Sequence, residues 1–177
     1  MRSRVAAVAL LCFSLAAAGK SPAPQFDPAH PPRAGDEGVF YGPLVRVKDG
    51  DSLVVKVQGV QMEIRLSDVD APELDQPYGP RSQQDLMALA SGQQLVIMPF
   101  DTDRYGRTVA HVWNGSTYLN AELVKRGAAW FYPEFARNAA LYDMEQEARN
   151  AKRGLWALPL KDRVEPRVWR ERKRHRN

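Results

Sequence analysis

The stretch of residues 48–73, KDGDSLVVKVQGVQMEIRLSDVDAPE, constrains the fold of this chain more than any other. It contains two runs rich in β-branched residues, with turn signals before the first at 49–50 and between the two at 58–59. In residues 62–66, apolar and polar side chains alternate, which is the period-two pattern of a half-buried strand. The stretch therefore predicts two short strands with one face in a core, and it places Arg65 on the opposite face.

Similar signals along the chain predict the remaining elements. Asn120 has the side chain of a helix N-cap, and Gly127 follows the last turn of the same short helix. Five short strands with a helix between the third and fourth are typical of a small Greek-key barrel. We therefore expect an α+β, mainly β fold: a five-stranded OB-fold barrel with about three helices. The expected strands cover residues 39–47, 52–57, 62–66, 95–98 and 109–113, with 116–119 pairing back, and the expected helices cover 77–92, 120–126 and 136–153.

The chain divides into four segments by composition. Residues 1–19 have a charged start, an apolar run and small residues at their end, as a secretory signal peptide has. An uncleaved membrane anchor is the alternative interpretation of that run. Residues 20–37 form a Pro-rich linker, residues 38–160 the folded body, and residues 161–177 a basic tail. We expect a secreted or periplasmic protein without stable membrane association once the signal is cleaved.

Positive charge is concentrated at the C-terminus. The whole chain has a net charge of +4, whereas the tail from residue 161 onward holds eight Lys or Arg against three Asp or Glu. Such asymmetry indicates that the tail contacts an anionic partner, and phosphate contacts by its arginines would raise affinity for nucleic acid. A solvated tail without a partner remains the alternative.

Three acids and two arginines carry the chemistry that the sequence offers. Asp51 and Asp70 supply hard oxygen ligands that favour Ca²⁺ or Mg²⁺ over zinc. Glu73 lies close to Asp70 in the chain and can orient or deprotonate a water molecule. Arg65 and Arg107 can make paired hydrogen bonds to phosphate oxygens. Each residue also has a purely structural interpretation, as a turn, loop or surface group, so their joint occurrence is what indicates a phosphodiesterase.

Other nucleolytic chemistries find no support in the sequence. The three histidines are His30, His111 and His175, and they are far apart with no motif around them. This argues against a ribonuclease that uses a histidine pair. No Gly-rich phosphate loop and no Ser-His-Asp arrangement stands out either.

Four sequence blocks resemble the staphylococcal nuclease (thermonuclease) family. They are DGDS at 49–52, RLSDVDAPE at 65–73, DRYGR at 103–107 and EARNAKRGLWALP at 147–159. Their order and spacing are also similar to those of the family. The resemblance covers residues 38–159, nearly all of the predicted folded body.

The resemblance implies a role for eight residues. The calcium ligand at Ala71 would be its main-chain carbonyl, since many relatives have threonine there. The substrate-stacking tyrosine of the family has no clean match near residues 130–132, because Pro133 interrupts the similarity. The implied residues are Asp51, Asp70 and Ala71 for Ca²⁺, Arg65, Glu73 and Arg107 for catalysis, and Arg104 and Tyr105 for substrate binding.

The resemblance also implies an activity. We expect a Ca²⁺-dependent, largely sequence-nonspecific endonuclease of the micrococcal type, which hydrolyses DNA and RNA to leave 3′-phosphate ends. The expected substrates are single-stranded or unpaired nucleic acids, and the expected state is a monomer. A catalytically inactive OB-fold module that only binds nucleic acid is one alternative. A calcium-binding or interaction protein of the envelope is another, but it would need neither Arg65 nor Arg107.

Overall fold

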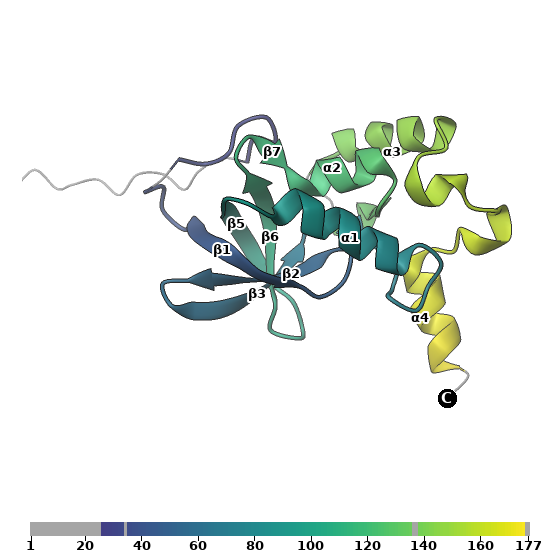
Figure 1. The fold of residues 1–177 in the computed structure, drawn as a ribbon, viewed down its shortest axis with the longest axis horizontal. Coiled ribbons are helices and arrows are strands. Elements are labelled where there is room, and N and C mark those ends of the chain that lie inside the picture. Colours follow the sequence, from purple (N-terminus) through teal and green to yellow (C-terminus); the bar gives the residue numbers. More distant parts are fainter. Residues whose placement is uncertain (1–25, 34, 136–137, 176–177) are drawn as a thin grey trace, which may run out of the picture.

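Five strands close into a barrel in the computed structural model, which describes residues 26–33, 35–135 and 138–175 (Figure 1). Neighbouring strands follow the order β3-β2-β1-β5-β6, and a parallel pairing of β3 with β6 closes the circle. The closed circle confirms the expected five-stranded OB-type barrel. Its strands are β1 Phe40–Val47, β2 Ser52–Val57, β3 Val60–Leu66, β5 Gln94–Thr102 and β6 Thr108–Asn114.

The helices stand outside the barrel. Figure 1 shows α1, α2 and α3 gathered beside it, with α4 beyond the loop that leads into α1. The described residues contain four α-helices, and the one that exceeds the expected number lies in the basic tail. These helices are α1 Gly79–Ala90, α2 Leu119–Arg126, α3 Ala140–Asn150 and α4 Pro166–Arg174; the short strands are β4 Val69–Asp70, β7 Thr117–Tyr118 and β8 Trp130–Phe131, and 3₁₀ turns cover Pro133–Phe135, Gly154–Ala157 and Leu160–Asp162.

The strand alternation predicted for residues 62–66 is present in β3. Ile64 and Leu66 are fully buried in the barrel core, whereas Arg65 between them lies on the other face. Arg65 is the pairing partner of Ser52, the first residue of β2. The backbone N–H of Leu66 donates to the carbonyl of Asp51 at 2.8 Å, which ties the β1–β2 turn to the end of β3. The barrel thus fixes Asp51 and Arg65 side by side at one of its ends.

Asn120 does not cap helix α2, so that prediction is wrong. The N-cap position is Tyr118, and no side chain there bonds to the helix end. Asn120 is fully buried, where its Oδ1 accepts from the N–H of Val112 and its Nδ2 donates to the carbonyls of Ser67 and Ala110. The buried amide of Asn120 thus bonds to the backbone of three other residues instead of to its own helix end. The helix end at Gly127 is confirmed, because this residue has the left-handed φ of 66° typical of a C-cap.

Part of the expected linker packs against the barrel. The Phe26 ring stacks on His111 at 3.8 Å between ring centroids, and the indole of Trp113 donates to the carbonyl of Pro28. The predicted signal peptide, residues 1–19, lies outside the described residues. Among the helices that the structure describes, none is both long and apolar enough to cross a membrane.

Candidate active site

Two buried carboxylates converge on one arginine at the end of the barrel. The Nη2 of Arg65 lies 3.2 Å from Oδ2 of Asp51 and 3.3 Å from Oδ1 of Asp70. Asp51 follows the β1–β2 turn, Arg65 comes from β3, and Asp70 ends the short strand β4. Nη1 of Arg65 donates to the carbonyl of Leu66, which fixes the direction of the guanidinium group. The structure therefore brings together three residues that the sequence singled out.

Close packing behind the β1–β2 turn holds this arrangement. The backbone N–H of Ala71 donates to Oδ2 of Asp51 at 2.6 Å. A Cβ on Gly50 would collide with the side chain of Ser82 in α1 and lie 2.6 Å from the Cβ of Ala71. Ser82 is itself fixed by a 2.7 Å hydrogen bond to the carbonyl of Ala128. Only glycine fits at position 50, because helix α1 presses the turn against the loop that carries Ala71.

Arg107 joins the group through a serine. Its Nη1 donates to Oγ of Ser52 at 3.2 Å, and Ser52 Oγ donates to Oδ1 of Asp51 at 3.1 Å. Its Nε donates to Asp103 at 2.7 Å, and the backbone N–H of Arg107 bonds to the same carboxylate. Burial by itself would raise the pKa of Asp103, but these hydrogen bonds outweigh it and lower the pKa. Asp103 therefore stays charged and holds Arg107 beside the carboxylates.

Arg104 and Tyr105 lie at the tip of the β5–β6 turn, away from the buried acids. Nη2 of Arg104 donates to the hydroxyl of Tyr105 at 2.7 Å. The guanidinium carbon of Arg107 lies 5.5 Å from the centre of the Tyr105 ring, which is largely exposed. The pair therefore extends the site outward from Arg107 and offers an exposed aromatic face next to positive charge.

Glu73 lies in the loop between β4 and α1. Its backbone N–H donates to Oε1 of Gln76 at 3.2 Å, and the helix start at Gly79 passes so close that a Cβ there would collide with the Glu73 carbonyl. The Glu73 carboxylate accepts from Nη1 of Arg170 at 2.7 Å. Arg170 also spans both oxygens of Asp70, at 3.2 Å from Nη1 and 3.0 Å from Nη2. A tail residue is thus what links Glu73 to the carboxylate group.

Burial and charge shift the pKa values of this group. Burial raises the pKa of Asp70, and the hydrogen bonds of Arg170 only partly offset that rise. Burial and the nearby charge of Asp51 raise the pKa of Asp49 to about 6. Burial disfavours the charge on Arg170, but its bonds to Asp70 and Glu73 outweigh burial and raise its pKa further. Several carboxylates therefore lie close together here, and nearby cations stabilise their charged forms.

The oxygen donors of this site suit a hard divalent cation. Asp51 and Asp70 each place one carboxylate oxygen within 3.3 Å of the same nitrogen of Arg65, and the backbone of Ala71 contacts Asp51 through its N–H. Within the ranges that the structure describes, no three His, Cys, Asp or Glu side chains gather into a group that could hold a metal ion by themselves. Two carboxylates alone would supply only part of the oxygen ligands of a hard cation, and water or a substrate oxygen would have to supply the rest.

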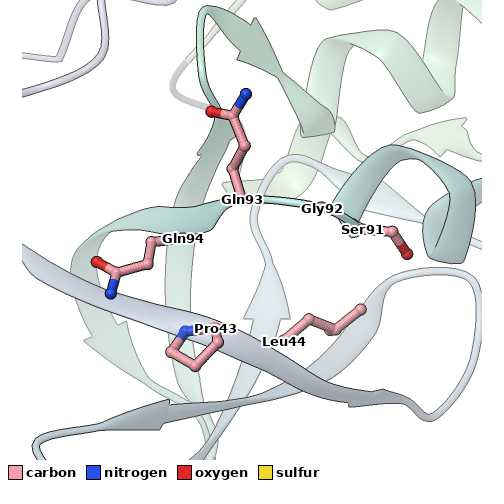
Figure 2. Close-up of a pocket in the computed structure, with 6 residues that line it drawn as sticks. All are labelled: Pro43, Leu44, Ser91, Gly92, Gln93 and Gln94. Atoms are coloured by element: carbon pink, nitrogen blue, oxygen red, sulfur yellow. The ribbon is translucent and has the colours of Figure 1, made fainter.

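An aromatic groove of about 600 Å³ adjoins Asp70. Phe131, Tyr132 and Tyr142 contribute rings to its wall, and part of the tail lies along it. A second hollow of about 370 Å³ lies between β1 and the turn into β5 (Figure 2). Its lining residues carry no charge: they are Pro43, Leu44, Ser91, Gly92, Gln93 and Gln94. The groove beside Asp70 is therefore the one whose position and chemistry relate to the carboxylate group.

The chain thus has a closed OB-type barrel with a cluster of acids and arginines at one end, and known proteins resemble it in sequence. Residues 63–158 match the family described as staphylococcal nuclease homologue. The chain is 38% identical over 142 residues to a micrococcal nuclease of Shigella flexneri, covering 74% of this chain and 80% of that protein. It is 38% identical over 135 residues to an uncharacterized endonuclease of Escherichia coli O157:H7, covering 76% and 87%. The staphylococcal-like nuclease CAN1 of Arabidopsis thaliana is 34% identical over 122 residues, covering 69% and 37%.

This chain belongs to the staphylococcal nuclease family, and it is a nuclease. The family match confirms the resemblance first indicated by the four sequence blocks. The eight residues expected at the site fall into four groups. Asp51, Ala71, Asp70 and Arg65 meet directly, Arg107 joins through Ser52, and Arg104 with Tyr105 lies outward; Glu73 joins through Arg170.

Sequence reasoning overlooked three contributors to this site. Two of them, Ser52 and Asp49, are in the DGDS block next to Asp51. Their polar side chains could have indicated hydrogen bonds to the site. Arg170 was assigned only to a general basic tail. The sequence did contain a sign of its role, because Pro166, Trp169, Arg170 and Lys173 follow the i, i+3, i+4, i+7 spacing of one helical face. Such a face can pack against another part of the protein. That part, the acidic loop after β4, is recognisable only in three dimensions.

Proposed function

We propose that this chain is a Ca²⁺-dependent, largely sequence-nonspecific endonuclease that hydrolyses DNA and RNA to 3′-phosphate ends. The observation that carries the proposal is the meeting of Asp51, Asp70 and Arg65 at one end of the barrel, with Arg107 joined through Ser52. Binding alone needs no carboxylates beside a phosphate, because they repel it. Acids held next to phosphate-binding arginines therefore favour hydrolysis over the alternative of an inactive binding module.

Ca²⁺ would be held by Asp51, Asp70 and the main-chain carbonyl of Ala71. When bound, it supplies positive charge that neutralises the scissile phosphate. The burial of the two aspartates raises the cost of leaving their charges uncompensated, which favours a cation there. Arg65 already lies between them, so a phosphate next to the cation would be within reach of its free donors.

The chain's own residues supply the rest of the reaction. Glu73 positions the attacking water and accepts its proton as the new P–O bond forms. Arg65 and Arg107 donate hydrogen bonds to the phosphate oxygens, and these bonds strengthen as charge builds up in the transition state. The bond from phosphorus to the 5′ oxygen breaks, an arginine donates a hydrogen bond to that oxygen, and the oxygen takes up a proton from solvent to become a hydroxyl. The other product keeps the phosphate on its 3′ carbon.

Single-stranded or unpaired nucleic acid is the proposed substrate. The exposed ring of Tyr105 with Arg104 beside it offers a stacking surface next to positive charge, and the aromatic groove beside Asp70 offers another. Stacking on aromatic rings tolerates any base but needs bases that are free of a duplex. Stacking contacts of this kind do not distinguish one base from another, which favours cleavage without sequence preference.

The proposed place of action is outside the cytoplasm. The signal-like composition of residues 1–19 supports secretion or export to the periplasm, followed by cleavage of the signal and action as a monomer. The N-terminus of the exported protein, measured by mass spectrometry, tests this part. Cleavage close to residue 19 supports it, and a retained N-terminus contradicts it.

Hydrolysis of single-stranded DNA with Ca²⁺, and then with chelator, tests the proposed activity. We expect cleavage that requires Ca²⁺, products with 3′-phosphate ends, and a loss of Ca²⁺ binding in Asp51→Asn. Calorimetry of Ca²⁺ binding provides the second readout. Activity that persists in chelator contradicts the metal site, and salt-sensitive binding without any cleavage favours the inactive module.

A further inference from the structure

The tail helix α4 contacts the residues on which the proposed reaction depends. Arg170 makes a two-pronged contact with Asp70, at 3.0 and 3.2 Å, and a third hydrogen bond to Glu73 at 2.7 Å. The tail is more than 90 positions away from both acids in the sequence. Figure 1 shows α4 beside the loop that joins β4 to α1. Helix α4 thus lies on the candidate active site through its own charged side chain.

The contact extends along one face of the helix. The indole of Trp169 donates to Oδ1 of Asp75 at 3.1 Å, and Nζ of Lys173 lies 2.6 Å from Oδ2 of the same carboxylate. The side chain of Gln76 donates to the carbonyl of Val164 just before the helix. Trp169, Arg170 and Lys173 stand at i, i+1 and i+4, so one helical face meets one acidic loop.

The other arginines of α4 are placed differently, and Arg167 lines the aromatic groove beside Asp70. Arg167 pairs with Glu171 within the helix itself, at 3.2 Å. Arg172 and Arg174 are exposed. A tail that served only as a general basic surface would present its arginines alike to solvent. Here Arg170 differs from the other tail residues that the structure describes, because it is the one that bonds to Asp70 and Glu73.

We propose that α4 is an autoinhibitory latch, in which Arg170 occupies Asp70 and Glu73 and is displaced by Ca²⁺ and the substrate phosphate. This inference rests on the proposed function and adds a regulation of the same site. A carboxylate whose two oxygens are both bonded to a guanidinium group is not free to bind a cation. A glutamate bonded to an arginine is a poor acceptor for the proton of water. The latched form is therefore inactive, and the open form is the one that binds Ca²⁺.

The latch can open because its outer contacts are weak and its inner contact is replaceable. The pairs of Arg170 with Glu73 and of Lys173 with Asp75 are partly exposed, and such pairs are individually weak and sensitive to salt. The pair of Arg170 with Asp70 has a buried carboxylate, but that carboxylate keeps Arg65 as a second cationic partner when Arg170 leaves. The helix has nine residues, which is too short to persist in water once it leaves the body. Ca²⁺ binding and unfolding of α4 are therefore coupled. For a ligand that binds only the open form, the apparent Kd equals the Kd of the open form divided by the fraction of molecules that are open.

Three substitutions in the full chain test the latch. Arg170→Ala removes the central contact. Asp75→Asn loosens the helix but leaves Arg170 with its charge. Arg172→Ala is the matched control, because it removes the same charge from the same helix at an exposed position. The readouts are the Kd for Ca²⁺ by calorimetry and the hydrogen exchange of residues 166–174 by mass spectrometry, both without nucleic acid.

We expect Arg170→Ala and Asp75→Asn to bind Ca²⁺ about three- to tenfold more tightly than wild type. In both variants, α4 should exchange rapidly without Ca²⁺, whereas wild type and Arg172→Ala should do so only after Ca²⁺ is added. Asp75→Asn separates the latch from a simple charge effect. If the charge of Asp75 acted only electrostatically, its loss would weaken Ca²⁺ binding. If Asp75 holds the latch closed, its loss strengthens Ca²⁺ binding.

The outcomes separate this proposal from the proposed function. A wild-type chain that neither binds Ca²⁺ nor cleaves DNA contradicts the proposed function. A chain that does both, but in which Arg170→Ala and Asp75→Asn behave like Arg172→Ala, overturns the latch alone. A raised KM for DNA in Arg170→Ala with an unchanged Kd for Ca²⁺ also overturns it, because Arg170 would then serve the substrate.

Discussion

The barrel end and the tail helix meet at the same carboxylates, but different forces hold them. Asp51 and Arg65 are positioned by strand pairing and by a turn that helix α1 presses into place. Helix α4 has a single buried residue, Pro166, and otherwise touches the body through polar and charged side chains. The positions of Asp51 and Arg65 thus depend on close packing, which is costly to disturb. Access to the carboxylates depends on the polar contacts of α4, which water and ions can replace.

This difference has a simple energetic basis. A fully buried apolar side chain stabilises a fold by about 1.5–3 kcal/mol, whereas an exposed ion pair contributes about 0.2–1 kcal/mol. Changes at the barrel end should therefore damage folding or chemistry, and changes at α4 should alter regulation alone. Each of the following substitutions tests one side of that contrast.

Among the changes that compare the barrel end with the tail helix, the largest effect is expected for Arg65→Ala. The variant loses a donor to the phosphate and leaves the buried charges of Asp51 and Asp70 facing each other. We expect kcat to fall by about 10²–10³, the range found when one charge-stabilising donor is removed. Ca²⁺ should raise the melting temperature of this variant more than that of wild type. Arg65→Lys is the control and should restore stability better than activity, since lysine cannot form the paired contact. A kcat within tenfold of wild type for Arg65→Ala would contradict this role.

Gly50→Ala should be the next most harmful change. Its new methyl group collides with Ser82 and Ala71, so the turn must move and carry Asp51 with it. Overpacking of this kind costs about 1–3 kcal/mol of folding free energy. Denaturant unfolding measures that loss, and calorimetry should show weaker Ca²⁺ binding in the molecules that remain folded. Ca²⁺ affinity and stability both equal to wild type would show that the turn is not held by close packing.

Asn120→Ala separates stability from chemistry. The substitution removes the side-chain partner of the buried Val112 N–H and of the Ser67 carbonyl, whereas the Ala110 carbonyl keeps its bond from the Ser67 N–H. Unsatisfied buried groups of this kind cost about 1–3 kcal/mol each, with partial relief from relaxation. We expect the free energy of unfolding to fall by about 2 kcal/mol, with unchanged Ca²⁺ affinity. A change in Ca²⁺ affinity with no loss of stability would contradict this assignment.

Asp75→Asn should have the smallest effect on folding. Its two contacts to α4, from Trp169 and Lys173, are exposed. Such surface pairs contribute little to the global free energy of unfolding, because solvent and salt screen them. The midpoint of denaturant unfolding should stay within error of wild type while exchange in α4 rises. A marked loss of global stability would mean that α4 is part of the folded core.

The strands of the barrel were predictable because their signals are local. Alternation in residues 62–66 and the turn at 49–50 place β3 and β2 without knowledge of anything distant. Strand β5 is longer than the expected 95–98, reaching from residue 94 to 102. Pro99 lies within it, and the register shifts between Pro99 and Asp101, so the strand continues past a residue that usually ends one.

The site was predictable where its residues fall in compact blocks, and not where they depend on distant packing. Asp51, Arg65 and Asp70 lie within one short stretch of chain, and their chemistry is evident from residue type. Asn120 was misassigned because a cap and a buried amide have the same sequence signal, and only the surrounding backbone decides between them. The role of Arg170 was not predicted, because the sequence does not show that the basic helix lies against the acidic loop after β4.

Single-turnover hydrolysis of single-stranded DNA by Glu73→Gln, at saturating Ca²⁺, tests the central claim most directly. The account predicts a fall of about 10²–10⁴ in the rate of bond cleavage, since the proton acceptor is lost. It also predicts that Ca²⁺ still binds, because Asp51, Asp70 and Ala71 are unchanged. A cleavage rate within tenfold of wild type would contradict the assignment of Glu73, and with it the carboxylate group as the centre of hydrolysis.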